Sequence, residues 1–82
     1  MIPIRFLLRI EFSGPHRKVV DRYWSPVRTR GMQDLNVQAQ ERADRLIQEE
    51  IESTYRGNPP EFTVALYRQI PLSSKWTRNE SI

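Results

Sequence analysis

The stretch that decides the fold is IRFLLRIEF, residues 4–12. Every second side chain in it is apolar, and the side chains between them are mostly charged: the apolar set is Ile4, Phe6, Leu8, Ile10 and Phe12. A period of two is typical of a strand that buries one face, because neighbouring side chains of a strand point to opposite sides. The pattern predicts a half-buried strand over residues 4–12.

Two further segments have strand character. Breaker residues at 13–15 predict a turn, after which residues 19–25 are expected to form a second strand, with Pro26 ending the ladder. The alternation there is poorer and does not tell which of Tyr23 and Trp24 faces the core. Residues 61–69 form the third predicted strand, in which Phe62, Val64 and Leu66 alternate with Thr63, Ala65 and Tyr67.

The period changes to that of a helix in the middle of the chain. Apolar residues there recur at helical spacing, as Ala39, Ala43, Leu46, Ile47, Ile51 and Tyr55. Asn36 is suited to cap the first turn, and Gly57 followed by Pro59 is suited to end the last one. The spacing predicts a helix over residues 37–55.

The order strand, strand, helix, strand predicts a two-layer α+β domain of ββαβ type over residues 1–70. We expect a three-stranded antiparallel sheet in the order 2-1-3, with the helix packed on one face. Residues 71–82 are predicted to be a polar tail that frays unless Trp76 docks. The second and third strands form uncovered edges, through which a homodimer is one expectation.

The composition argues against several classes of function. The chain has 82 residues, no Cys and one His, so the usual ligand sets of a metal site are missing. His16 lies in a predicted turn without an acid or a nucleophile beside it, and the three glycines form no phosphate-binding loop. We therefore expect no enzyme activity, no metal and no cofactor. No apolar run reaches the about 20 residues of a membrane span, so we expect a cytoplasmic protein without membrane contact.

The charge is unevenly distributed. Residues 1–33 carry seven Lys or Arg against two acids, and residues 34–61 carry three against seven. These counts give +5 and −4, so a cationic sheet is expected opposite an anionic helix. Eleven of the thirteen cations are Arg, whose planar head forms bidentate and stacking contacts.

The stretch DRYWSPVRTRG, residues 21–31, combines aromatic rings with Arg, the side chains most enriched at interface hot spots. The first hypothesis is therefore a non-enzymatic module that binds a protein with an acidic surface and acts by occlusion or adaptation. Its predicted contact residues are Arg5, Arg9, Arg22, Trp24, Arg28, Arg30 and Tyr67. In size, absence of Cys and two-layer plan the chain is similar to small phage or prophage accessory proteins, including inhibitors of host defence machinery, although no motif assigns it to a family.

The second hypothesis is nucleic-acid binding through the basic hairpin and the uncovered sheet face, on which aromatic side chains could stack with bases. No recognition helix or sheet-borne aromatic motif supports it. A third interpretation is packing alone: one of Tyr23 and Trp24 must face the core in a regular strand, so half of that pair is expected to be structural.

Overall fold

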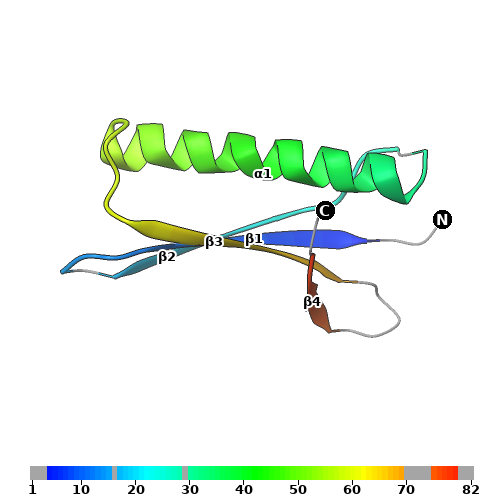
Figure 1. The fold of residues 1–82 in the computed structure, drawn as a ribbon, viewed down its shortest axis with the longest axis horizontal. Coiled ribbons are helices and arrows are strands. Elements are labelled where there is room, and N and C mark those ends of the chain that lie inside the picture. Colours follow the sequence, from blue (N-terminus) through cyan, green and yellow to red (C-terminus); the bar gives the residue numbers. More distant parts are fainter. Residues whose placement is uncertain (1–3, 16, 29, 70–74, 80–82) are drawn as a thin grey trace.

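The computed structural model describes residues 4–15, 17–28, 30–69 and 75–79; His16 and the rest of the predicted tail lie outside them. The elements in chain order are β1 (Arg5–Phe12), β2 (Lys18–Trp24), α1 (Met32–Tyr55), β3 (Phe62–Gln69) and β4 (Trp76–Arg78). The strands form one antiparallel sheet in the order β2-β1-β3-β4, and α1 lies along one face of it (Figure 1). The α+β class is confirmed, but the prediction of three strands is wrong because β4 adds a fourth.

The alternation in β1 builds the core as predicted. Phe6, Leu8, Ile10 and Phe12 are each at most 1% exposed and face α1. Two small helix residues, Ala39 and Ala43, are buried against them, which allows α1 to approach the sheet closely. Each large side chain that is fully buried contributes about 1.5–3 kcal/mol, so this single layer of contacts is the main source of stability.

The helix begins at Met32, five residues before the predicted start. Leu35, one helical turn before Ala39, is only 4% exposed and packs in the cluster with Phe6, so the apolar stripe starts earlier than expected. Asn36 is not the cap: it lies inside the helix, and the Asp34 carboxylate accepts a hydrogen bond from the Arg30 backbone N–H at 3.0 Å instead. The predicted end is confirmed, since Tyr55 is the last helical residue.

The sheet face away from α1 carries a second, smaller cluster. Leu7 points to that face yet is only 4% exposed, with Tyr23 of β2 and Tyr67 of β3 directly opposite it in the two ladders. β4 pairs with the end of β3, on the opposite edge of the sheet from β2. The ring of Trp76 in β4 nevertheless lies 5.8 Å from the ring of Tyr23 in β2. Trp76 therefore extends beneath the strands between them, and this part of the face is covered.

The molecule is elongated, with extents of 43 × 22 × 20 Å. No helix among the described residues combines the length and the apolarity that crossing a membrane requires.

Candidate functional site

The seven predicted contact residues do not form one surface. Because side chains alternate along a strand, Arg5, Arg9 and Tyr67 lie on the face away from α1, whereas Arg22 and Trp24 lie on the α1 side. Arg28 and Arg30 lie in the connection between β2 and α1. The site predicted from sequence is thus divided among three regions, which differ in what their cations already contact.

On the face away from α1, the cations have partners within the chain. Arg9 donates two hydrogen bonds to the carboxylate of Asp21, at 2.9 and 3.0 Å, because the two residues are opposite each other in the β1–β2 ladder. This hydrogen bonding lowers the pKa of Asp21 below its ordinary value and raises that of Arg9. The Arg5 guanidinium lies over the Tyr23 ring, 5.6 Å from its centroid. Of the two predicted cations on this face, Arg9 is therefore ion-paired, and Arg5 keeps its charge but is stacked on a ring.

On the α1 side, Arg22 ties the edge strand to the helix. Its guanidinium donates to the Glu50 carboxylate at 2.9 Å, and Lys18 lies 3.9 Å from the same carboxylate. Glu50 is only 8% exposed, and its second oxygen accepts a hydrogen bond from the Thr54 hydroxyl. A buried carboxylate needs such partners, so Arg22 is engaged in holding α1 on the sheet.

Trp24 is the member of the aromatic pair that packs in the core. Its ring is stacked on Phe6 with 5.6 Å between centroids, and it contacts both apolar clusters. Tyr23 points the other way and is half exposed. Most of Trp24 therefore serves packing, and the part left for a ligand is its outer edge.

That outer edge forms part of a hollow between α1 and the segment after β2. The hollow has a volume of about 380 Å³, and we call it the basic groove; it is lined by Trp24, Ser25, Pro26, Val27, Gln38, Ala39, Glu41, Arg42 and Arg45. Its floor is apolar, and Val27 at its side is 74% exposed. Its charged lining residues all come from α1 and are the guanidinium groups of Arg42 and Arg45 and the carboxylate of Glu41, which leaves a net positive charge.

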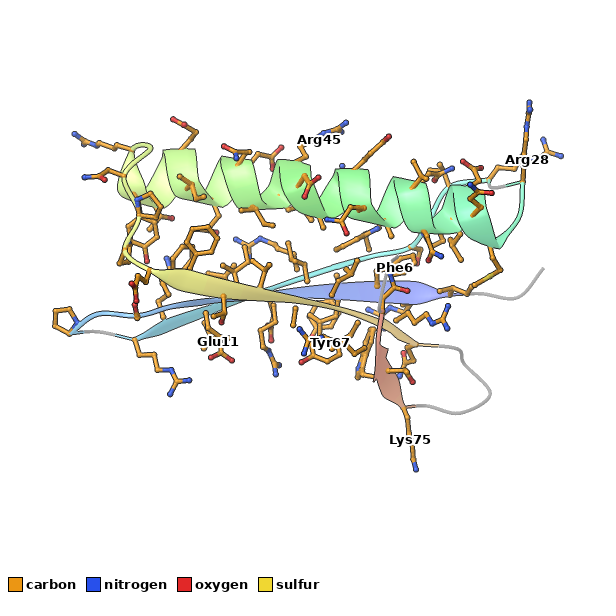
Figure 2. The ribbon with its side chains drawn as sticks, viewed as in Figure 1. Phe6, Glu11, Arg28, Arg45, Tyr67 and Lys75 are labelled. Carbon is orange, nitrogen blue, oxygen red and sulfur yellow. The ribbon has the colours of Figure 1, made fainter. Side chains whose placement is uncertain are left out.

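Two hydrogen bonds hold the loop beside this groove. The Gln38 side-chain amide donates to the backbone oxygen of Arg28 at 3.3 Å, and the Arg30 N–H donates to Asp34. The side chain of Arg28 points away from α1 at the end of the molecule, while Arg45 points outward from the middle of the helix (Figure 2). Within the described part of the chain, no ion pair engages Arg28, Arg30, Arg42 or Arg45.

Sequence reasoning missed Arg42 and Arg45. They belong to a segment with a net charge of −4, and this average concealed them. Their spacing of three residues places them on adjacent parts of the helix surface, which is the signal that could have identified them.

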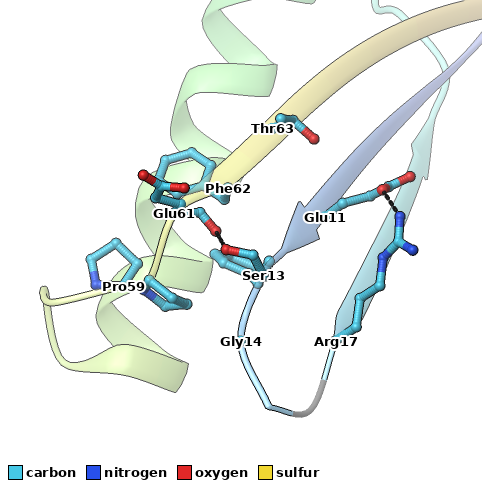
Figure 3. Close-up of a pocket in the computed structure, with 10 residues that line it drawn as sticks. Glu11, Ser13, Gly14, Arg17, Pro59, Glu61, Phe62 and Thr63 are labelled. Carbon is cyan, nitrogen blue, oxygen red and sulfur yellow. Dashed lines mark hydrogen bonds and ion pairs between the residues drawn. The ribbon is translucent and has the colours of Figure 1, made fainter.

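A second hollow lies at the opposite end of the sheet, between the β1–β2 turn and the chain that leads into β3 (Figure 3). It has a volume of about 740 Å³. The Ser13 hydroxyl donates to the backbone oxygen of Glu61 at 2.8 Å, and Arg17 is paired with Glu11 at 2.9 Å. The Ser13 hydroxyl is thus engaged with a backbone oxygen rather than with a base, and the lining residues include no His.

Among the described residues, no group of three or more His, Cys, Asp or Glu is placed to hold a metal ion. No protein-family model, curated protein or solved structure matches the chain.

Proposed function

We propose that this chain is a non-enzymatic protein-binding module that uses the basic groove to hold an acidic segment of a partner protein. The observation that carries the proposal is the gathering of unpaired guanidinium groups around an apolar floor. Arg42 and Arg45 of α1 line the groove, and Arg28 and Arg30 belong to the loop beside it without being among its lining residues.

The chemistry of the groove favours a partner segment that combines carboxylates with apolar side chains. Guanidinium groups bind carboxylates through two parallel hydrogen bonds, and these contacts gain strength where the surroundings exclude water. Val27, Pro26 and the edge of Trp24 supply apolar surface next to them. Aromatic residues and Arg around a partly desolvated hollow are typical of interface hot spots.

A module of this kind acts by occupying a surface of its partner rather than by chemistry on it. An accessory or inhibitory role, as in small phage proteins, is one consequence of such occlusion and stays a prediction. Nucleic acid is the competing ligand, because phosphates also bind Arg. Nucleic acid is less favoured as the ligand, because few aromatic rings are free to stack with bases. Trp24 packs on Phe6. The Tyr23 ring already contacts Arg5 and Trp76.

The test measures fluorescence anisotropy of a labelled ten-residue peptide of Glu and Leu. We expect it to bind the native chain, and to bind the double variant Arg42→Glu, Arg45→Glu at least tenfold more weakly, which corresponds to about 1.4 kcal/mol or more. The matched control is Arg56→Glu with Arg68→Glu, which changes the net charge equally on residues outside the groove. The control should bind like the native chain.

Equal weakening by the two double variants would show a general charge effect and contradict a groove-specific site. A labelled ten-residue oligothymidine is measured in parallel. If it binds more tightly than the peptide, with a log–log salt slope of about −0.7 for each phosphate contacted, the partner is a nucleic acid and the proposal is wrong.

A further inference from the structure

The two ends of the long axis of the molecule differ in shape and in charge. One end is the loop between β2 and α1, where Arg28 points away from the helix (Figure 2). The other end contains the second hollow, between the β1–β2 turn and the chain that leads into β3 (Figure 3). The longest extent of the molecule is 43 Å, so the loop of one copy does not reach the hollow of that same copy.

The loop end presents an apolar side chain next to a cation. Val27 is 74% exposed, more than any other large apolar residue that the structure describes. Arg28 follows it in the chain, and its guanidinium has no ion-pair partner among residues 4–15, 17–28, 30–69 and 75–79. The Gln38 side-chain amide donates to the backbone oxygen of Arg28 at 3.3 Å and anchors the loop. We call Val27 and Arg28 together the loop tip.

The second hollow presents a surface complementary to the loop tip. Its apolar wall is formed by Pro59, Pro60 and Phe62, and Phe62 is 36% exposed. Glu61 lies in the same segment, and its side chain is exposed. Within the described part of the chain, no ion pair engages its carboxylate. The hollow therefore combines apolar surface with an unpaired negative charge.

We infer that the loop tip of one copy of the chain inserts into the second hollow of another copy. Val27 then contacts the apolar wall, and Arg28 pairs with the carboxylate of Glu61. An Arg–carboxylate pair forms two parallel hydrogen bonds, which fixes the orientation of the two copies. The other cation of the hollow, Arg17, is already neutralised by Glu11 at 2.9 Å.

The position of the two surfaces determines the kind of assembly. A contact between different surfaces of two copies leaves one loop tip and one hollow free, so it continues to further copies unless the rotation closes a ring. The association is therefore head-to-tail and is not limited to a dimer. Because Val27 also lines the basic groove, an acidic segment bound there competes with the second copy for this side chain.

The test is sedimentation equilibrium of the purified chain up to 500 µM, where we expect the mean mass to rise reversibly from 9.8 kDa to more than twice that value. Arg28→Glu and Glu61→Arg should each weaken the association at least tenfold, because each sets like charges against each other in the contact. The matched control for Glu61→Arg is Glu49→Arg, which makes the same change in net charge at an exposed helix residue outside the hollow. The control should associate like the native chain.

An equimolar mixture of Arg28→Glu and Glu61→Arg gives the sharpest result. Each altered loop tip then meets an altered hollow of opposite charge, and each native loop tip meets a native hollow, so the mixture should regain the association of the native chain. Circular dichroism establishes that both variants are folded. A chain that stays at 9.8 kDa at 500 µM, a mass that levels off at twice that value, or a mixture that stays monomeric overturns the inference. Equal weakening by Glu49→Arg and Glu61→Arg overturns it as well.

Discussion

The two faces of the sheet accommodate the side chains of β1 in different ways. The face toward α1 buries a row of apolar side chains from β1 under one helix. The other face carries cations at alternate positions of the same strand, and it satisfies them one by one with Asp21 and the Tyr23 ring. A charge on a paired strand thus finds a cross-strand partner at a fixed distance. The two cations that line the proposed groove, Arg42 and Arg45, lie on the outer helix surface, where no ladder supplies a carboxylate.

The largest expected difference in stability comes from two adjacent residues of β1 that point to opposite faces of the sheet. Leu8→Ala should lower the free energy of unfolding by about 2–5 kcal/mol, because it leaves a cavity in the core under α1. Leu7→Ala, on the other face, should cost about half as much, since β4 and the tyrosines can adjust around the smaller side chain. Urea denaturation measures both. Equal losses would mean that the second cluster is as rigid as the core.

Replacing a cation that has an ion-pair partner should cost more stability than replacing a cation that has none. Arg22→Glu should lower the free energy of unfolding by about 2 kcal/mol, because it removes the closer of the two cations that pair with the buried Glu50 carboxylate and adds a second carboxylate beside it. Arg45→Glu makes the same change in net charge at a site without an ion pair, and should change stability by less than about 0.5 kcal/mol. Thermal unfolding measures the stability of both variants. Similar losses would contradict the claim that Arg22 has an ion-pair partner that matters for stability and Arg45 does not.

The cover on the second face is tested by Trp76→Ala. We expect a loss of about 1–2 kcal/mol in the free energy of unfolding, from the apolar contacts of the ring and its pairing with Tyr23. Hydrogen exchange should show faster exchange in β4 and at the end of β3, with the amides of β1 opposite α1 unchanged. A variant as stable as the native chain would show that residues 75–79 do not hold the face closed.

The smallest effect concerns the ion pair between Arg9 and Asp21. The pKa of Asp21 is lower in the folded chain than its ordinary value near 3.9, so the pair stabilises the fold above about pH 4. That contribution is lost as the pH falls through the folded pKa. Asp21→Asn should therefore be slightly less stable than the native chain at pH 7, and the difference should shrink below pH 4. A difference that stays constant from pH 7 to pH 2.5 would contradict the assigned pKa direction.

The sequence predicted those parts of the fold that local patterns encode. The alternation in residues 4–12 was enough to place Phe6 and Leu8 on the core side, and the breakers after Tyr55 were enough to end the helix. β4 was missed because three residues are too few to show a period, and Trp76 finds its place only through contacts with Tyr23 on a distant strand.

The candidate site was harder to predict, because it depends on which cations are left unpaired. Arg9 and Arg22 look alike in the sequence, yet strand register brings Asp21 to the first and the helix brings Glu50 to the second. Arg42 and Arg45 became candidates only when the loop after β2 was seen to lie beside them. The net charge of a sequence segment does not predict a binding site, because the carboxylates that pair with its cations come from other elements.

The central claim is that binding is located at the basic groove rather than on the sheet face away from α1. The most direct measurement is a backbone amide NMR titration of the native chain with the Glu–Leu peptide. We expect the shifted amides to be confined to residues 25, 27, 28 and 38–45, and we expect these shifts to disappear in Arg42→Glu, Arg45→Glu. Shifts centred on residues 5–9 and 63–67, or shifts at the groove that persist in the double variant, would contradict it.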